Sequence, residues 1–359
     1  MKFCSECFKY EEVRDMISSL DIKGNCDIND EHKNVYICDT EDNFETTKNI
    51  KNVLRQIIDI YTAEDELPSN FPDNRQDLLR HSLKNRWSLF NLDAQSIQYI
   101  LDLFFKGDSD FEQKLLTNRV GVLEENNTLE DLLIIRNNNW KEFAESIKYS
   151  NRFHTKALNL KNLGYFLNFT SKVLQKSRSK HYFRCRVSNT VELKEKDLGA
   201  PPKDKATAGR LNPEWISVLY LSNSESSCVQ EVRASFRDDV YIGSFSLNRD
   251  IKVVDLRNFE NITLQADVDY LKYYLNRETL IKIAEDFAKP SNNDIKDINY
   301  LPLQYISEFI KSLVEAYDGI LYKSTMGNDA SNLVLFDETL AKCTCVVKKN
   351  VTEINYILG

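Results

Sequence analysis

Several residues in the second half of the chain are of types that bind anions or flat cations. Arg184 and Arg186 share one face of a strand-like segment, because side chains alternate along a strand, and Arg210 follows a glycine, which lets a backbone approach a ligand closely. Guanidinium groups from two strands bind phosphate oxygens through paired hydrogen bonds, although the same arginines could equally form surface ion pairs. Without further context, Tyr220 is interpreted as a core aromatic residue and Glu231 as a solvated helix residue.

These residues stand in an ordered series of short motifs. In chain order the motifs are Tyr182-Phe183-Arg184-Cys185-Arg186, Ala200-Pro201-Pro202, Ala206-Thr207-Ala208-Gly209-Arg210-Leu211-Asn212, Val218-Leu219-Tyr220-Leu221, Glu231, Asp318-Gly319-Ile320-Leu321-Tyr322-Lys323-Ser324 and Asn332-Leu333-Val334-Leu335-Phe336. The series resembles the RES-domain family, bacterial NAD-degrading toxins named for their Arg, Glu and Ser, over approximately residues 176–350. The preceding part resembles, more loosely, the cysteine-bearing helical domain found before RES domains in some bacterial proteins.

The resemblance implies that NAD is the substrate and that the fold is ADP-ribosyltransferase-like. At the matching positions, Arg184 and Arg210 would bind the pyrophosphate of NAD. Tyr220 would form a wall of the nicotinamide pocket, where its ring can stack on a flat cationic ring. Arg184 and Tyr220 would thereby belong to the catalytic group as well as to the binding site.

The remaining matched positions would take part in the reaction or hold the substrate for it. Glu231 would be the catalytic carboxylate, holding the ribose 2′-hydroxyl and stabilising the oxocarbenium-like sugar that forms when the bond to nicotinamide breaks. Because nicotinamide leaves as a neutral molecule, no general acid is needed, and one carboxylate is enough. Ser324 would help to hold the phosphate or ribose through its hydroxyl, and Asn332 would contribute to the same binding site.

Four functions therefore compete for this sequence. The leading prediction is cleavage of NAD by hydrolysis or phosphorolysis, and its close alternative is transfer of ADP-ribose to a protein. A non-catalytic interaction module is a third, and a HEPN-type ribonuclease is the fourth, since Arg75 and His81 have the loose spacing of such enzymes. On one continuous helix, however, those two side chains would lie roughly 120° apart around the axis, which is poor geometry for a joint site.

The N-terminal cysteines suggest a metal site. Cys4 and Cys7 form one half of a zinc ribbon, in which a turn directs two thiolates at one metal ion. The second half has only Cys26, because Asn29 stands where the fourth thiolate is expected. His32 or Cys38 could replace it, or the module is a degenerate ribbon without metal. In either case we expect its role to be structural.

The elements that must position these residues change character along the chain. After the cysteine-bearing module, at 1–40, residues 41–175 are predicted to be helical, with helices at 75–88, 94–106, 138–149 and 161–175 and an amphipathic face over 50–61. From 176 to 359 short strands are interrupted by three helices. The predicted strands are 182–187, 216–221, 241–247, 251–256, 319–322, 333–336, 343–347 and 353–357, and the helices are 224–236, 266–287 and 302–317. This order predicts an α+β protein with a helical N-terminal domain and a mixed-sheet C-terminal domain.

Composition indicates the class of protein and where we expect it to act. The chain has 359 residues, a formal charge of −8 and 42% apolar residues, which is typical of a soluble globular protein and disfavours a general nucleic-acid binder. No signal peptide or membrane span is apparent, so we expect a cytoplasmic protein that does not act on membranes. The resemblance implies a toxin held by an Xre-type antitoxin, or a phage-defence effector that answers to a trigger. A homodimer is compatible with the sequence, which does not determine the oligomeric state.

Overall fold

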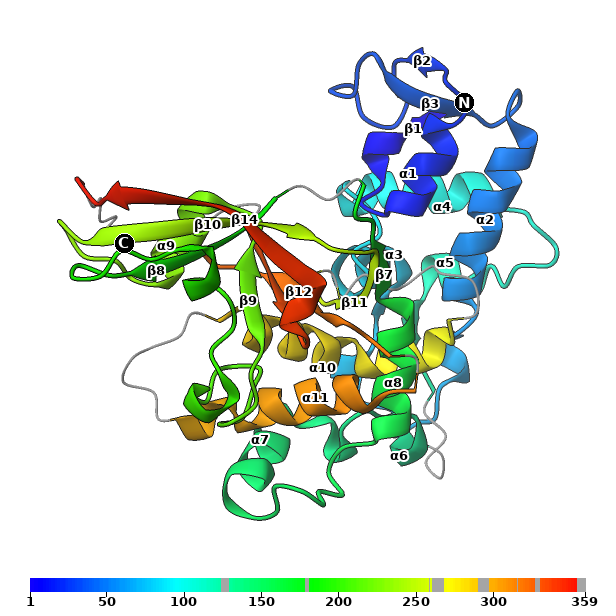
Figure 1. Ribbon diagram of the computed structural model, residues 1–359. Coiled ribbons are helices and arrows are strands. Elements are labelled where there is room, and N and C mark those ends of the chain that lie inside the picture. The colour runs from blue at the N-terminus through cyan, green and yellow to red at the C-terminus, as the bar shows by residue number, and fades with distance from the viewer. Residues whose placement is uncertain are drawn as a thin grey trace. The chain divides into compact units, whose positions relative to one another are not determined.

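The computed structural model describes residues 1–123, 129–177, 181–257, 259, 268–289, 297–314, 316–326 and 330–353. The chain divides into two compact units. Unit 1 comprises Met1–Leu129 and Thr263–Tyr274, and unit 2 comprises Glu130–Ile262 and Leu275–Gly359. The division gives a helical N-terminal unit and a second unit built on a large mixed sheet, in agreement with the predicted α+β class (Figure 1).

Unit 1 combines short helices with two small antiparallel sheets, whose strand orders are β1-β3-β2 and β4-β6-β5. Its strands are β1 (Lys2–Cys4), β2 (Lys23–Gly24), β3 (Val35–Asp39), β4 (Thr62–Ala63), β5 (Asp77–Leu78) and β6 (Arg119–Gly121). Its α-helices are α1 (Glu11–Ser18), α2 (Phe44–Ile58), α3 (Leu79–His81), α4 (Ala94–Phe105) and α5 (Lys114–Thr117). The Asp93 side chain caps α4 by accepting from the backbone amides of Gln95 and Ser96, which explains why that helix begins where the sequence predicts.

Unit 2 is organised around one eight-stranded sheet with the strand order β14-β10-β8-β9-β13-β12-β11-β7. Its strands are β7 (Ser171–Leu174), β8 (Tyr182–Val187), β9 (Leu219–Ser222), β10 (Asp239–Leu247), β11 (Ile251–Asp255), β12 (Gly319–Lys323), β13 (Ser331–Leu335) and β14 (Ala341–Asn350). Its helices are α6 (Leu129–Leu132), α7 (Trp140–Tyr149), α8 (Leu160–Phe169), α9 (Glu225–Glu231), α10 (Tyr270–Ala288, from Leu275 onward in this unit) and α11 (Leu301–Ser312). The sheet is mixed because β11 and β12 are parallel and the other pairs are antiparallel.

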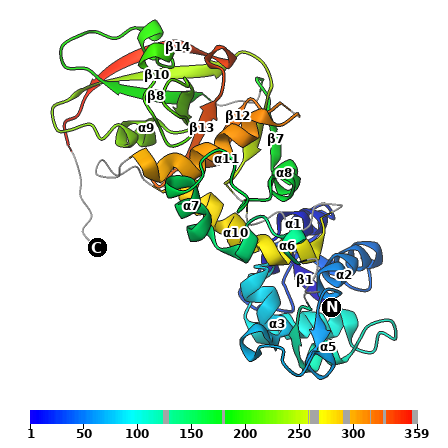
Figure 2. The same cartoon turned by 90° about the horizontal axis from the view of Figure 1, so that it is seen from below.

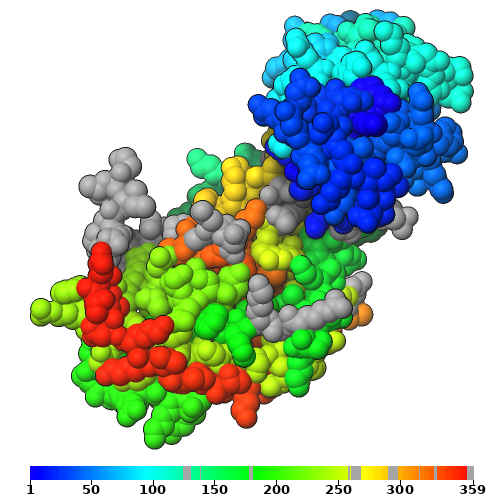
Figure 3. Space-filling view, turned by 90° about the horizontal axis from the view of Figure 1, so that it is seen from above, coloured from blue at the N-terminus to red at the C-terminus, as the bar shows by residue number. Residues whose placement is uncertain are grey.

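The sheet is covered differently along its length. Helices α10 and α11 lie along the part formed by β9, β13 and β12, and α9 packs beside β8 and β10 (Figures 1 and 2). The face of the sheet that carries Leu221, Leu321 and Leu333 packs into a buried apolar cluster with Phe245 and Leu198. Strand β14 is an edge strand with mostly exposed residues, and in the space-filling view it runs along the outside of unit 2 (Figure 3).

Most predicted elements of unit 2 are present. Strand β8 has the predicted limits, and the other predicted strands up to 347 match within a few residues. The predicted strand at 353–357 falls almost entirely outside the described residues. The predicted helix 161–175 is wrong in its second half, because α8 ends at Phe169 and Ser171–Leu174 forms an edge strand that pairs with β11. Residues 130–175 belong to unit 2, whereas the predicted domain boundary lies near 176, where helical periodicity gives way to strands.

In unit 1 the predicted helix 75–88 is correct only in its second half. Residues Asp73–Arg75 form a 3₁₀ turn and Asp77–Leu78 a short strand, and helical structure begins at Leu79. Among the described residues, no helix is both long enough and apolar enough to cross a membrane.

Candidate active site

A cavity of about 240 Å³ opens in unit 2 where β8 and β9 separate. The two strands share a single registered pair, Phe183 with Ser222, so their backbones diverge beyond it. The cavity is lined by Phe183, Arg184, Cys185, Tyr220, Leu221, Ser222, Cys228, Glu231, Val232, Tyr322 and Asn332. Strands β8, β9, β12 and β13 and helix α9 therefore all contribute to one site.

Glu231 is held in this cavity by two buried side chains. It is the last residue of α9, a helix whose N-terminus is capped by the Ser224 side chain. Its Oε1 accepts a hydrogen bond of 2.9 Å from the Ser324 hydroxyl and another of 2.9 Å from Nδ2 of Asn332. Ser324 and Asn332 are each only 7% exposed, whereas Glu231 is exposed. Buried donors therefore hold one carboxylate oxygen, and the other accepts no hydrogen bond from the described residues.

Arg184, on strand β8, supplies positive charge to the same cavity. Its Nη1 donates to the backbone oxygen of Tyr220 at 3.2 Å, a contact that joins β8 to β9 where their own pairing ends. Its Nε is buried and has no hydrogen-bond partner among the described residues. Burial, and after it the charge of Arg186, lower the pKa of Arg184 to about 10. A buried N–H without a partner is an unmade hydrogen bond that costs free energy, and an anionic ligand is one kind of group that could satisfy it.

The Tyr220 ring lines the cavity while its hydroxyl is tied into the loop before the strand. The hydroxyl donates to Oδ1 of Asn212 at 2.9 Å and accepts from the backbone N–H of Leu211 at 3.0 Å. Burial raises the pKa of Tyr220, so the hydroxyl stays protonated and keeps this role. A Cβ at Gly209 would lie 2.9 Å from the Tyr220 hydroxyl and 2.5 Å from Oδ1 of Asn212. Gly209 is thus needed for close packing on Tyr220, which differs from the expectation that its backbone approaches a ligand.

Arg210 lies beside the cavity rather than in its wall. Its Nη1 donates to the backbone oxygen of Phe287 at 2.6 Å, and its guanidinium lies 5.9 Å from the centre of the Tyr322 ring. Tyr322 does line the cavity, and burial raises its pKa to about 12. The carbonyl of Gly209 accepts a hydrogen bond of 2.7 Å from Gln304 of α11, which fixes the loop that carries Arg210.

The structure thus brings together most of the predicted residues. Arg184, Tyr220, Glu231 and Asn332 line one cavity, with Arg210 and Ser324 adjoining it. Two further contacts concern Ser324 and Arg186. Ser324 directs its hydroxyl at Glu231, and the contact with substrate that the resemblance implies stays a prediction. The guanidinium of Arg186 donates to the carbonyl of Gly199 at 3.0 Å and takes no part in the cavity wall.

Sequence reasoning missed Tyr322 and Ser222 in the cavity wall. Both lie in a row with Asn332, because the registers pair Tyr322 with Asn332 and Asn332 with Ser222 across three adjacent strands. Residues paired across a sheet present their side chains on the same face. The alternation of side chains in the motifs that contain Tyr220 and Tyr322 could have indicated which residues share a face of each strand. Only the order of the strands in the sheet shows that these faces line the same cavity.

A comparison with protein-family models matches residues 183–357 to the RES domain. This part of the chain is a RES domain. The match begins at the second residue of β8 and includes every residue that lines the cavity. Neither the curated proteins nor the solved structures give a significant match to the chain.

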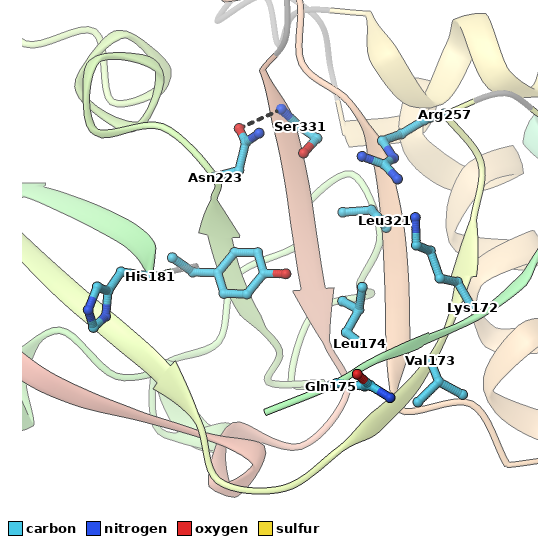
Figure 4. Close-up of a pocket in the computed structure, with 10 residues that line it drawn as sticks. Lys172, Val173, Leu174, Gln175, His181, Asn223, Arg257, Leu321 and Ser331 are labelled. Atoms are coloured by element: carbon cyan, nitrogen blue, oxygen red, sulfur yellow. Dashed lines mark hydrogen bonds between the residues drawn. The ribbon is translucent and has the colours of Figure 1, made fainter. Parts of the chain in front are cut away.

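A larger hollow of about 550 Å³ also borders the RES domain and carries basic residues (Figure 4). Lys172 and Arg257 point into it, and Asn223 accepts a hydrogen bond of 2.8 Å from the backbone N–H of Ser331 at its margin. Arg257 is already engaged by both carboxylate oxygens of Asp255, at 2.8 and 2.6 Å. Among the described residues that line this hollow, none is a carboxylate and none has a buried donor without a partner, so the smaller cavity is the better candidate active site.

Unit 1 contains a separate cluster of metal-ligand types. The side-chain ligand atoms of Cys4, Cys7, Cys26 and His32 all lie within 4.8 Å of one another, so these residues could hold a metal ion. Cys38 is not part of the cluster, because its Sγ lies 3.5 Å from the hydroxyl of Thr47.

Arg75 and His81, whose spacing suggested a ribonuclease, lie in different elements of the structure. His81 Nδ1 lies 3.0 Å from a carboxylate oxygen of Asp77, and Arg75 stands in the preceding 3₁₀ turn. The predicted helical relation between Arg75 and His81 is therefore wrong, because a short strand separates the two residues.

Proposed function

We propose that the RES domain binds NAD and breaks the bond between nicotinamide and its ribose. The observation that supports this most strongly is the pairing, on one cavity, of a buried arginine with a spare donor and a carboxylate with one oxygen held. Arg184 keeps its Nε–H without a partner among the described residues, and Glu231 is fixed through Oε1 alone. Such a pair suits a substrate that carries phosphate at one end and develops positive charge at the other.

The size of the cavity indicates which part of NAD would enter it. At about 240 Å³ it is smaller than the usual pocket for a drug-sized ligand, so it suits the nicotinamide and its ribose rather than the whole dinucleotide. The ring would stack on Tyr220 or Tyr322, both of which line the wall. The pyrophosphate would then lie towards Arg184, with Arg210 close by.

The proposed bond cleavage follows from the positive charge that develops on the ribose and the negative charge of Glu231. When the bond between the ribose C1′ and the ring nitrogen breaks, its electron pair stays on nicotinamide, which leaves as a neutral molecule. The sugar becomes oxocarbenium-like and positively charged. Glu231 lines the cavity, and its second carboxylate oxygen accepts no hydrogen bond from the described residues; it would accept one from the ribose 2′-hydroxyl and stabilise that charge. The buried donors Ser324 and Asn332 keep the carboxylate in place, so little reorganisation is needed during the reaction.

The nucleophile that completes the reaction distinguishes the alternatives. Water adding to C1′ would give ADP-ribose, inorganic phosphate would give ADP-ribose 1″-phosphate, and a protein side chain would give an ADP-ribosylated protein. We propose hydrolysis or phosphorolysis, with protein ADP-ribosylation as the alternative. NAD loss of this kind would make the protein a toxin or defence effector, restrained by an antitoxin or released by a trigger.

The test is to incubate the purified chain with NAD, with and without inorganic phosphate, and to separate the products. Release of nicotinamide together with ADP-ribose or its 1″-phosphate supports the proposal. Glu231→Gln should abolish most of this release. Glu225→Gln is the matched control, because Glu225 opens the same helix but pairs with Lys349 and does not line the cavity. A folded protein that leaves NAD intact under all these conditions would refute the proposed activity.

A further inference from the structure

The cysteine-bearing module of unit 1 has the geometry of a closed metal centre. Sγ of Cys7 lies 3.5 Å from Sγ of Cys4 and 3.5 Å from Sγ of Cys26. Nδ1 of His32 lies 3.2 Å from Sγ of Cys4 and 3.9 Å from Sγ of Cys7. Zinc held tetrahedrally by thiolates at about 2.3 Å and imidazole at about 2.0 Å requires ligand atoms about 3.5–3.8 Å apart. The observed separations scatter around that range.

We propose that this cluster holds one zinc ion through Cys4, Cys7, Cys26 and His32, with His32 Nδ1 as the fourth ligand. The proposal is independent of the proposed NAD chemistry and concerns residues that play no part in it. Three sulfurs and one imidazole nitrogen match the ligand preference of zinc, whereas calcium and magnesium take oxygen ligands. All three cysteines are buried, with exposed fractions of 0%, 0% and 5%. A centre with four protein ligands leaves no position for substrate, so its role is structural.

The backbone builds the site from two turns. A 3₁₀ turn, Ser5–Cys7, brings the first two sulfurs together at the end of β1. The segment from Cys26 to His32 closes on itself, because the N–H of Cys26 donates to the carbonyl of His32 at 3.0 Å and the N–H of His32 donates to the carbonyl of Asn29 at 3.0 Å. The N–H of Ile28 also donates to Sγ of Cys26 at 3.4 Å, a contact that stabilises a thiolate.

The register of the small sheet explains why Cys38 is not the fourth ligand. Strand β1 pairs with β3 so that Phe3 lies opposite Cys38 and Cys4 lies opposite Ile37. Neighbouring side chains on a strand point to opposite faces, so Cys38 lies on the face away from Cys4. Asn29, at the position of the missing thiolate, lies beside the imidazole instead, with Nδ2 3.4 Å from Nε2 of His32. Oδ1 of Asn29 accepts a hydrogen bond of 2.9 Å from the backbone N–H of Glu31, so this amide closes the turn that carries His32 and does not act as a metal ligand.

The experiment measures metal on the full chain. Elemental analysis of the purified protein should find about one zinc per chain. Replacement by Co²⁺ should produce the visible absorption of a tetrahedral, thiolate-rich site. His32→Ala should weaken zinc binding at least tenfold in competition with a chromogenic chelator. His32→Cys should retain about one zinc and increase the thiolate-to-cobalt absorption, because it restores a fourth soft ligand.

Two cysteine variants serve as controls. Cys345→Ser removes an exposed thiol and Cys38→Ala a buried one outside the cluster, and both should keep the metal. If His32→Ala does not fold, His32→Cys still decides the matter. The proposal is overturned if the folded wild-type chain contains no zinc and takes up no Co²⁺. It is equally overturned if Cys38→Ala loses the metal while His32→Ala keeps it, or if folded His32→Cys binds none.

Discussion

The hydroxyl of Ser324 donates a hydrogen bond of 2.9 Å to Oε1 of Glu231, a residue 93 positions earlier in the chain. The serine is 7% exposed and follows β12, whereas the glutamate ends α9. We propose that Ser324 positions this carboxylate for the proposed reaction. The contact itself joins the segment after β12 to the end of α9.

Removing the charge of Glu231 should lower turnover. For Glu231→Gln we expect kcat for NAD cleavage to fall by roughly 10²–10³, which is about 3–4 kcal/mol of transition-state stabilisation. Binding of NAD should change little, because positive charge reaches the sugar only as the bond breaks. Steady-state kinetics and calorimetric binding separate the two quantities. A Glu231→Gln protein that is folded, binds NAD and cleaves it within about twofold of wild type would remove Glu231 from the chemistry.

The hydrogen bond between Ser324 and Glu231 predicts that substitutions at these two residues have non-additive effects on kcat. Ser324→Ala should lower kcat roughly 5- to 50-fold with little change in KM, because a hydrogen bond to a charged group is lost while the binding groups stay in place. In a Glu231→Gln background the same change should have a much smaller effect, since the two residues act as one unit. Equal effects of Ser324→Ala in both backgrounds would show that the serine acts elsewhere, for example directly on substrate.

Arg184 should contribute to affinity. Arg184→Ala is expected to weaken NAD binding by about 1.5–3 kcal/mol, or roughly 10- to 150-fold in Kd, through loss of charge-assisted contacts with phosphate. Arg184→Lys should restore only part of it, because an ammonium group lacks the paired donors of a guanidinium. Arg152→Ala, at an exposed position of the same unit, is the control for loss of one positive charge. Wild-type Kd and kcat in Arg184→Ala would mean that this arginine does not bind the substrate.

The pKa of Arg184 predicts a pH range for binding. Burial lowers this pKa to about 10, so the guanidinium remains charged up to about pH 9, and it loses its proton only as the pH rises through 10. The contribution of Arg184 to NAD affinity should therefore be constant from pH 6 to 9 and decline above that range. A phosphate bound beside it would raise the pKa and widen the plateau. Comparing the wild-type and Arg184→Ala Kd at each pH isolates this contribution, and a difference that disappears between pH 7 and 8 would contradict the assignment.

Gly209 allows a steric prediction. In Gly209→Ala the new Cβ would meet Oδ1 of Asn212 at 2.5 Å and the Tyr220 hydroxyl at 2.9 Å, so the ring or the loop must shift. We expect a loss of about 1–3 kcal/mol in unfolding free energy, together with weaker NAD binding as Tyr220 moves. Gly164→Ala is the matched control. Gly164 lies within helix α8, where alanine is the better helix former, and a Cβ there would meet Phe309 and Leu313 at the ordinary contact distances of 3.6 and 3.9 Å. Thermal unfolding of both variants checks the difference, and equal Tm values would contradict it.

The sequence by itself determined much of the local structure and which residues are candidates for the site. Strand β8 could be predicted to the residue because it begins with two aromatic residues and Phe183–Val187 then alternates apolar and polar side chains, and the Asp93 cap marks the start of α4. The ordered motifs that indicated a RES domain were readable from residue types alone, and the family match confirms them. These features depend on neighbours within a few residues of one another, which a linear pattern records.

Only the tertiary structure decided which residues meet. The edge strand β7 was mistaken for helix because its pairing with β11 involves residues about 80 positions away. The same reason applies to Tyr322, which reaches the cavity through the register of β12 on β13, and to the role of Ser324. In unit 1, the choice of His32 over Cys38 beside the cysteines rests on the pairing of β1 with β3 and on the closed turn from Cys26 to His32. Strand register and loop closure are set by packing and hydrogen bonds between distant segments, so residue spacing alone does not specify them.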